Sequence, residues 1–306
     1  MFLGPFRPNT KFYRGNLHGH STASDGLWSA EQVAQFYQDK GYDFICLSDH
    51  LWSDVRFASS KVTDGRLLDS DVFLTIPSAE LHCLGKKYDN DGLWHIVANG
   101  LPLDFAMATK EERAAELVQR AIDAEAYVSI AHPEWYSMTM AEADVVSHAH
   151  AVEIYNHSCA TGSARGSGIA IADYLLQEGH RISFTATDDS HFDRPDGAGG
   201  WVMVAADTFT PEAIIAALKA GQHYSSTGLD FHEIQFDDGQ LSLSCSPCSS
   251  IMISGAGHVA NAVNGTSLIK AEFDISDIKS DWIRITIQDQ AGQKAWTNPF
   301  WLADLG

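Results

Sequence analysis

The chain has 306 residues, of which 45% are hydrophobic and 20% charged, a composition typical of a globular protein with a sizeable core. Its 40 acidic side chains against 20 basic ones give a net charge of −20, which argues against nucleic acid as a bulk partner, because phosphate backbones are bound by lysine and arginine. The five cysteines imply no disulfide framework, and we find no signal-peptide pattern and no membrane-spanning apolar run, so we expect a cytoplasmic protein.

The first motif lies at residues 17–26. His18 and His20 stand two positions apart, and side chains two positions apart on a strand leave the same face. Asp25 and Gly26 then give a turn from which the carboxylate can return toward both imidazoles. The spacing predicts that one short piece of backbone presents three ligands to metal.

Short apolar runs alternate with helical patterns as far as about residue 225. A capping box at Ser29–Gln32 predicts a helix that ends near Gly41. Further helices are expected at 111–125, near 169–179, and after Thr210, where a cap residue precedes a proline. The expected strands include residues 44–47, 73–76, 95–98, 127–131, 151–155 and 182–186. This alternation predicts an α/β fold with a mostly parallel sheet, and about seven such strands favour a closed or nearly closed barrel.

Side chains that bind metals follow most of these strands, at the end where barrel enzymes carry their sites. They are His50, Glu80, His132, Asp189 and His191, and His95 is the exception because it stands at a strand start. With His18, His20 and Asp25 they make nine candidates, which suit two or three ions of zinc, manganese or iron.

Each of these residues also has a purely structural interpretation. His18 and His20 could be a surface strand pair, Asp25 a turn residue, and Asp189 a helix cap. Their joint placement at strand ends favours the metal centre. Clustered ions would polarise a phosphoryl or acyl oxygen and lower the pKa of a bridging water.

Several other residues are weaker candidates. Arg194 lies close to His191 and could clamp an anionic group, with a surface ion pair as the alternative. Asn156 and His157 stand at a strand end and could face the substrate. Residues 197–200 form a glycine-rich loop that is either a mobile lid or a plain linker.

The character of the chain changes after about residue 225. No helical period appears, and isoleucines alternate with polar residues over 283–287. We therefore expect residues 1–225 to form the metal-binding barrel and residues 226–306 a small, antiparallel β domain. Cys245 and Cys248 have metal-ligand spacing but no second pair, so we expect two strand or turn cysteines.

The ordered motifs strongly resemble the PHP (polymerase and histidinol phosphatase) family of metal-dependent phosphoesterases. The resemblance covers roughly residues 12–225 and rests on segments 18–20, 24–26, 47–50, 78–80, 131–133 and 188–191. It implies a distorted seven-stranded (β/α) barrel, a distorted TIM barrel, which agrees with the strands expected above. A looser similarity over 200–202, 220–228 and 295–299 points to a branch that contains carbaryl-hydrolase-like metallohydrolases.

The resemblance also implies a trinuclear metal site. The three implied ligand groups are His18, His20, Glu80 and Asp189; Glu80, His95 and His132; and Asp25, His50 and His191. Some members of the family have histidine in place of Asp25, which leaves the site with two or three ions, and His82 is the alternative to His95.

The combined expectation is a metal-dependent phosphoesterase that acts on a small anionic substrate. A metal-bridging hydroxide would attack phosphorus, with Arg194 or His157 neutralising charge and with Asp189 or His191 as the proton relay. One alternative is a carbamate, ester or amide hydrolase with the same metals. Another is a non-catalytic metal- or carbohydrate-binding accessory protein. The sequence leaves the oligomeric state open.

Overall fold

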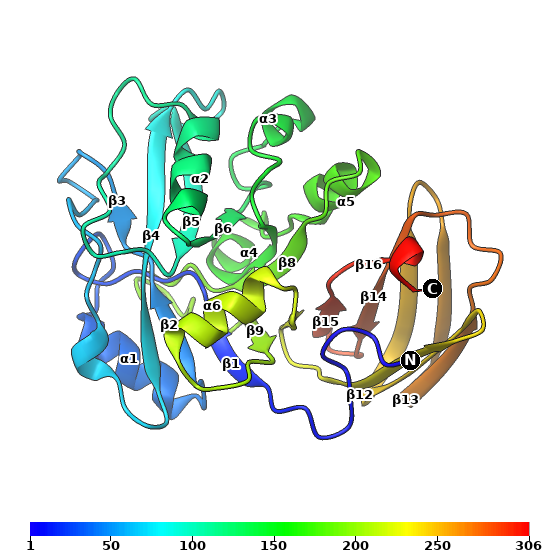
Figure 1. Cartoon of the computed structure of the whole chain (residues 1–306). Helices are drawn as coiled ribbons and strands as arrows, with labels where there is room; N and C mark the ends of the chain where they lie inside the picture. The colour runs from blue at the N-terminus through cyan, green and yellow to red at the C-terminus, as the bar shows by residue number, and fades with distance from the viewer. Residues whose placement is uncertain (306) are drawn as a thin grey trace.

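The structure is a computed structural model in which residues 1–305 are described, and it has a mixed α/β fold (Figure 1). Helices and strands alternate as far as α6, and strands dominate after it. The elements are β1 (Tyr13–Asn16), α1 (Ala30–Asp39), β2 (Phe44–Leu47), β3 (His50–Leu51), η1 (Arg66–Leu68), β4 (Leu74–Leu84), β5 (Leu93–Asn99), α2 (Ala114–Asp123), β6 (Tyr127–Ile130), α3 (Met140–Val145), β7 (Ala151–Asn156), α4 (His157–Ser163), α5 (Ile169–Gln177), β8 (Ser183–Thr187), β9 (Trp201–Val204), α6 (Pro211–Lys219), β10 (His223–Ser226), β11 (Phe231–Asp237), β12 (Gln240–Gly255), β13 (Ala260–Asp274), β14 (Trp282–Gln288), β15 (Lys294–Thr297), β16 (Phe300–Trp301) and η2 (Leu302–Asp304).

The helix starts follow the capping signals in the sequence. Ser29 Oγ accepts a hydrogen bond from the Gln32 amide, and Gln32 Oε1 accepts one from the Ser29 amide, which confirms the capping box of α1. Thr210 caps α6 and Pro211 occupies its first turn, also as predicted. The helix expected at 111–125 is shorter than predicted, at Ala114–Asp123.

The sheet is mixed, so the prediction of a mostly parallel sheet is only partly right. Strands β1, β2 and β4 are parallel, as are β6, β7 and β8, but β5 runs antiparallel to both of its neighbours. The reason is the short connection between β4 and β5. Gly85 and Gly92 both have positive φ there, and the Gly85 amide donates to the Gly92 carbonyl, so the chain turns back as a hairpin without a crossover helix.

The ends of this sheet approach each other without forming a continuous ladder. Among residues 1–305, no strand ladder joins β8 to β9. Instead, His223 Nε2 and Ser225 Oγ of β10 lie 3.1 and 3.0 Å from the Phe184 carbonyl of β8. Beyond the strand ends, Gly19 and Ser190 form an isolated parallel bridge. This bridge brings the segment after β1 against the segment after β8.

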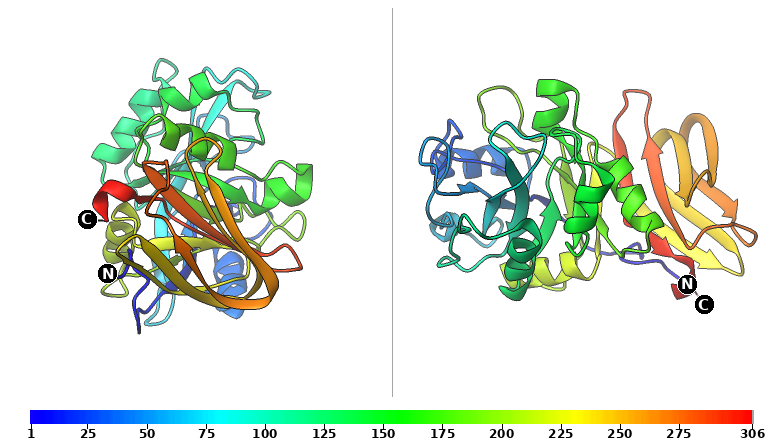
Figure 2. Two further views of the ribbon diagram at one scale, coloured as in Figure 1. Left: turned by 90° about the vertical axis from the view of Figure 1, so that its right-hand side faces the viewer. Right: turned by 90° about the horizontal axis from the view of Figure 1, so that it is seen from above.

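Residues 226–305, here called the β tail, continue the sheet through antiparallel strands (Figure 2). Its core is mainly aliphatic and includes Ile251, Ile253 and Ile285. Leu3 and Phe6 also belong to that core, and the Leu3 amide donates to the Ile234 carbonyl. The N-terminal residues therefore pack with the β tail, although we expected them from the sequence to belong to the barrel.

Side chains of β14 and β15 help to hold the β tail against the rest of the chain. Trp282 and Trp296 pack into the core of the α/β part. Arg284 of β14 forms a bidentate ion pair with Asp173 of α5, at 2.9 Å for each hydrogen bond.

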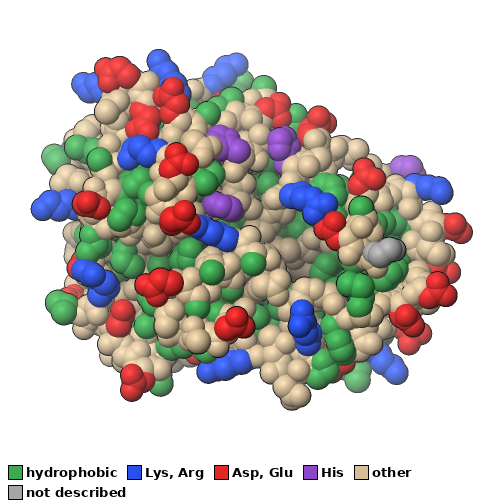
Figure 3. All heavy atoms as spheres, in the orientation of Figure 1, with side chains coloured by type: hydrophobic (Ala, Val, Ile, Leu, Met, Phe, Trp, Pro, Cys, Tyr) green, Lys and Arg blue, Asp and Glu red, His purple; other side chains and the backbone are tan. Residues whose placement is uncertain are grey.

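Every helix in residues 1–305 is too short or too polar to cross a bilayer. On the face shown in Figure 3, basic side chains are interspersed with acidic ones rather than gathered into a broad patch.

Candidate metal centre

Nine side chains predicted as metal ligands converge at one end of the sheet. Most reach it from the carboxyl ends of parallel strands. His50 lies directly opposite Glu80 in the parallel pairing of β3 with β4. The Gly19–Ser190 bridge sets the two short motifs side by side, because the Asp189 amide donates to the His18 carbonyl and the His20 amide to the Ser190 carbonyl.

The topology explains why His95, at a strand start, reaches the same end. Strand β5 is antiparallel to β4, so its first residues lie beside the last residues of β4. His95 pairs directly with His82, two positions beyond Glu80. The strand assignment is therefore compatible with a ligand role for His95 once the direction of β5 is known.

The ligand atoms form three overlapping groups that match the implied assignment, with small additions. In each group, one atom per residue lies within 4.8 Å of the others. The groups are His18, His20, Glu80 and Asp189; Glu80, His95 and His132; and His20, Asp25, His50 and His191. A fourth group contains His50, Glu80 and His82. Glu80, His20 and His50 are thus shared between groups.

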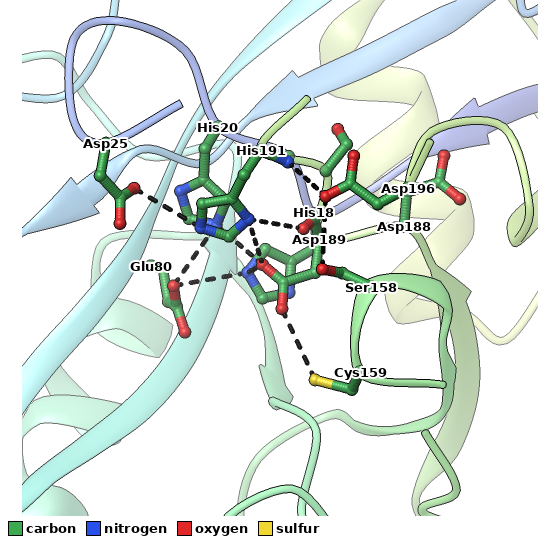
Figure 4. Close-up of polar contacts among 12 residues, drawn as sticks. His18, His20, Asp25, Glu80, Ser158, Cys159, Asp188, Asp189, His191 and Asp196 are labelled. Carbon is green, nitrogen blue, oxygen red and sulfur yellow. Dashed lines mark hydrogen bonds and ion pairs between the residues drawn. The ribbon is translucent and has the colours of Figure 1, made fainter. Parts of the chain in front are cut away.

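Short contacts within the groups show how the carboxylates face the imidazoles (Figure 4). Asp189 Oδ1 lies 2.9 Å from His20 Nε2 and 3.3 Å from His18 Nε2. Glu80 Oε1 lies 2.6 Å from His95 Nδ1 and 3.2 Å from the His132 ring.

Asp25 approaches the centre from the loop after His20. Its Oδ1 lies 3.4 Å from His50 Nε2 and 3.5 Å from His191 Nε2. Asp25 is the most exposed of the three carboxylates, since 35% of its side chain is accessible against 1% for Glu80.

Several buried atoms of the centre lack a hydrogen-bond partner among the described residues, which fits a bound cation. These atoms are His18 Nε2, His20 Nδ1, His132 Nδ1 and Glu80 Oε2. Glu80 Oε2 lies 2.7 Å from His50 Nδ1, but that nitrogen has hydrogen-bond geometry toward His82 Nε2 at 2.8 Å. Buried polar atoms are rarely left unpaired, and imidazole and carboxylate are suitable ligands for divalent metals.

The pKa values of Glu80 and His20 also fit a bound cation. Burial raises the pKa of Glu80, but the charges of His50 and other histidines more than offset this and hold it well below its usual value. Burial, with nearby His191 and His50, lowers the pKa of His20 to about 4, so its ring is neutral at pH 7, as a metal ligand requires.

His50 behaves in the opposite way. Burial lowers its pKa, but the nearby carboxylates of Glu80 and Asp25 raise it to about 10. Acidic groups therefore dominate the surroundings of His50, as a cation site requires.

Two of the candidate ligands have an unusual backbone. His132 has φ of 24° and Asp189 has φ of 55°, a region that residues other than glycine rarely adopt. Such strain persists where the surrounding contacts fix it, and it clusters at functional sites. The Asp189 amide is fixed by the His18 carbonyl and the His132 amide by Glu153 Oε2.

Buried carboxylates that the sequence analysis did not single out hold the loops in place. Asp49 accepts hydrogen bonds from the Ser21 amide and hydroxyl and from the Ser24 hydroxyl, which shapes the loop before Asp25. Asp196 accepts from the His191 amide. The only available signal for Asp49 was its place within the Ser48-Asp49-His50 motif.

The loop at residues 197–200 is anchored rather than free. Asp188 accepts hydrogen bonds from the amides of Ala198, Gly199 and Gly200, at 2.7 to 2.8 Å, and from the Tyr37 hydroxyl. A carboxylate with this many donors holds the loop in one conformation. The structure therefore favours the linker interpretation over the mobile lid.

A cavity of about 470 Å³ opens beside the centre. Its wall includes candidate ligands from all three groups, apolar side chains such as Phe57 and Trp135, and acidic side chains such as Asp89. Arg194 also lines it, in an ion pair with Asp193. A Cβ on Gly162 would lie 2.2 Å from Arg194 Nη1, so Arg194 takes this position because residue 162 is glycine.

The other two substrate-binding candidates lie elsewhere. Asn156 is buried, and its Nδ2 donates to Glu153 and to Asp189 Oδ2, both at 3.2 Å. His157 packs against Gly199, and its Nδ1 lies 2.9 Å from the Tyr155 hydroxyl. Neither residue is among those that line the cavity. Asn156 also caps α4, because its side chain accepts a hydrogen bond from the Cys159 amide.

The remaining motif lies apart from the centre. Cys245 and Cys248 are buried on β12 in the β tail, with their sulfurs 3.9 Å apart, and both thiols are free. None of the candidate metal groups within residues 1–305 contains a cysteine.

Comparison with known proteins gave matches to solved structures alone, since no family model and no curated protein matches the chain. A two-domain protein from Bacteroides vulgatus containing a predicted PHP-like metal-dependent phosphoesterase has a TM-score of 0.54 and 16% identity, covering 97% of this chain and 98% of that one. A proposed metal-dependent phosphoesterase from Bifidobacterium adolescentis has a TM-score of 0.43 and 12% identity, covering 62% and 92%. An amidohydrolase from Chromobacterium violaceum, with bound sulfate and no metal, has a TM-score of 0.39 and 12% identity, covering 60% and 89%. Across both of its parts, the chain therefore shares the fold of the Bacteroides vulgatus protein that contains a predicted PHP-like metal-dependent phosphoesterase.

Proposed function

We propose that the chain is a metal-dependent hydrolase of phosphate esters with a centre for two or three divalent ions. The observation that carries the proposal is the convergence of nine imidazole and carboxylate side chains in overlapping groups with unpartnered, buried ligand atoms. Zinc, manganese and iron suit this donor set. The shared fold with a protein that contains a predicted PHP-like phosphoesterase supports the choice of phosphate esters.

We assign the ligands to the three groups described above, with Glu80 as the bridging carboxylate. Its two oxygens face different sides, since Oε1 lies 2.6 Å from His95 Nδ1 and Oε2 lies 3.5 Å from His18 Nε2. When bound, the ions polarise a phosphoryl oxygen and activate water as the nucleophile. Asp25 lies in the most exposed group, so the third ion is the one bound most weakly.

The residues that complete the site bind and orient the substrate. Arg194 lines the cavity, where its guanidinium would neutralise charge on the phosphate oxygens. His191 donates its Nδ1 proton to the Asp189 carbonyl at 2.9 Å, which leaves Nε2 free either to bind metal or to accept a proton. Asp189 is the other candidate relay. An atom that binds metal cannot accept a proton at the same time. Whichever of His191 and Asp189 relays the proton must therefore do so through an atom that is not bound to metal.

We further propose that residues 1–225 form a distorted barrel and that residues 226–306 form a small β domain after it. The contacts that support closure of the barrel are the Gly19–Ser190 bridge and the hydrogen bonds from β10 side chains to the Phe184 carbonyl.

The test is a hydrolysis assay on purified protein, loaded separately with zinc, manganese and iron, against a broad panel of phosphate mono- and diesters. We expect metal-dependent release of phosphate or alcohol that a chelator abolishes and added metal restores. The absence of hydrolysis across the panel by metal-loaded protein would end the proposal.

A second candidate function is hydrolysis of a carbamate, ester or amide by the same centre. The observation that favours it is the cavity wall, which combines Phe57 and Trp135 with acidic residues such as Asp89, while Arg194 is already paired with Asp193. Such a wall suits a neutral, apolar substrate better than a dianion. Parallel assays with aryl carbamates and aryl phosphates separate the two functions, since acceleration of phosphates alone excludes this one.

A further inference from the structure

Glu153, on β7, is a buried carboxylate that belongs to none of the candidate ligand groups. Each of its two oxygens accepts two hydrogen bonds. His18 Nδ1 and Thr187 Oγ1 lie 2.7 and 2.9 Å from Oε1. The His132 amide and Asn156 Nδ2 lie 2.8 and 3.2 Å from Oε2. A carboxylate surrounded by four donors is held in one orientation, and that orientation is imposed on its partners.

The first consequence concerns the proton on His18. A neutral imidazole carries one proton, and a carboxylate at Nδ1 keeps that proton on Nδ1. Nε2 then has a lone pair, and this is the atom that lies 3.3 Å from Asp189 Oδ1 and 3.5 Å from Glu80 Oε2 without a hydrogen-bond partner among the described residues. Carboxylates placed behind metal-binding histidines fix their tautomer and raise their basicity in this way.

The second consequence concerns the backbone of His132. Its φ of 24° is unfavourable for a residue with a Cβ, so the conformation needs a contact to hold it. The hydrogen bond from the His132 amide to Glu153 Oε2 is such a contact, and it is strengthened by the carboxylate charge. Glu153 thereby places a second candidate ligand.

The third consequence passes through Asn156. Its amide nitrogen donates both to Glu153 Oε2 and to Asp189 Oδ2, each at 3.2 Å. Asp189 also has a left-handed backbone, with φ of 55°. One carboxylate is therefore linked to candidate ligands that follow three different strands, β1, β6 and β8.

We propose that Glu153 is the positioning residue of the metal centre: it sets the tautomer of His18 and the placement of His132 and Asp189 without binding metal itself. This inference rests on the proposed function, because it assumes that these residues bind metal. It makes no assumption about the substrate.

The test compares Glu153→Gln with Asp173→Asn in a titration of zinc against a chromogenic chelator. Glutamine keeps the size of the side chain, but one of its two ends is a donor and faces donors that the carboxylate accepts. We expect zinc affinity to fall about 10–100-fold, as for other residues behind metal ligands. Asp173→Asn removes a charge from the pair with Arg284, and neither residue belongs to a candidate ligand group or lines the cavity. It therefore controls for general destabilisation and should leave the affinity within about twofold.

A second readout reports on His18 directly. In wild type, the Nδ1 proton of His18 should give a strongly downfield NMR resonance, because it is hydrogen bonded to a buried carboxylate. The resonance should move upfield or vanish in Glu153→Gln and stay in place in Asp173→Asn. General damage to the fold predicts no such difference between two variants that both melt cooperatively.

If Glu153→Gln does not fold, Thr187→Val decides the matter, since it removes one hydrogen bond to Glu153 and keeps the side-chain shape. Its zinc affinity should then fall about 3–10-fold, in proportion to one lost hydrogen bond to a charged group. The inference is overturned if a folded Glu153→Gln, or Thr187→Val in its place, binds zinc as tightly as wild type. A wild type that binds zinc but cleaves no phosphate ester would contradict the proposed function and leave the inference on Glu153 standing.

Discussion

The residues buried around the candidate metal centre and those buried in the β tail differ in kind. Strands β12 and β14 of the tail bury isoleucines such as Ile253 and Ile285, which are fully inaccessible. At the metal centre, the fully inaccessible side chains include His18, His20 and Glu80. Apolar burial stabilises the tail without help from a ligand, whereas clustered carboxylates and imidazoles need a cation or a proton to offset their desolvation. The core of the tail is therefore stable by itself, whereas the candidate metal centre gains stability from a bound cation.

The largest effect that separates the two regions should come from His20→Ala. His20 belongs to two of the ligand groups, so its loss should remove metal from both and lower phosphate ester hydrolysis by at least about 10³-fold. His232→Ala, on the exposed face of β11, is the matched control and should keep full activity. The measurements are initial rates and metal content per protein. Retention of metal and activity by His20→Ala would remove this residue from the centre.

The converse change, Ile285→Ala, should affect stability alone. Ile285 is fully buried between neighbouring tail strands, so truncation leaves a cavity and lowers the free energy of unfolding by about 2–5 kcal/mol. Zinc affinity and kcat should stay at the wild-type level under conditions in which the variant is folded. Chemical denaturation and zinc titration check both statements. If affinity falls in step with stability, the centre depends on tail packing and the two regions are not separable.

Features that depend on neighbouring residues could be predicted from the sequence, and features that depend on distant contacts could not. The candidate ligands could be proposed because His18 and His20 stand two positions apart and because most of the others follow apolar runs. The expected strand does not reach the two histidines, since β1 ends at Asn16 and they flank the isolated bridge residue Gly19. The helix caps at Ser29 and Thr210 were found because capping is local. The direction of β5 was missed, since it depends on a short hairpin whose strand pattern looks like that of a parallel strand.

Glu153 was missed for a different reason. It lies inside an apolar run, Ala151–Tyr155, where the sequence shows only one charged residue in a buried strand. Its importance depends on contacts with His18, 135 positions earlier, and Thr187, 34 positions later. The supporting role of Asn156 was missed as well. A polar residue at a strand end is as well suited to face a substrate as to support a ligand.

Metal removal should destabilise the molecule by a smaller amount. Ions that bind the folded state alone stabilise it by about 2.7 kcal/mol when their free concentration is 100 times the Kd. Chelation should therefore lower the Tm of wild type and of Ile285→Ala by similar amounts, and leave that of His20→Ala unchanged. Differential scanning calorimetry with and without chelator provides the measurement. A chelator effect that persists in His20→Ala would place the stabilising ion outside this centre.

Lowering the pH should reduce the free energy of unfolding by about the same amount, through a histidine on β10, the strand that pairs with β15 of the tail. His223 of β10 is buried, and desolvation lowers its pKa to about 4, while the unfolded chain has the ordinary value near 6.5. The unfolded state therefore takes up the proton first, and stability is lost as the pH falls below 6.5. The contribution should be about 2 kcal/mol between pH 7 and pH 5. The check is urea denaturation at both pH values for wild type and His223→Gln. The variant should lose less stability by this amount, and equal losses would show that His223 is not buried as a neutral ring.

The smallest effect concerns Arg194, which borders the centre without belonging to it. Because 44% of its side chain is exposed and it is already paired with Asp193, a phosphate group gains only about 1 kcal/mol from it, or roughly a fivefold change in KM. Arg194→Met should raise KM for a phosphate ester by that factor. Asp193→Asn should lower it, because the freed guanidinium can turn to the substrate. Gly162→Ala should raise KM less than Arg194→Met does, since the added Cβ would displace Nη1 but leave the positive charge in place. Steady-state kinetics of the three variants measure these shifts.

An unchanged KM in Arg194→Met, with kcat also unchanged, would leave the neutral carbamate or ester as the better substrate for this cavity, because a neutral group does not need the cation.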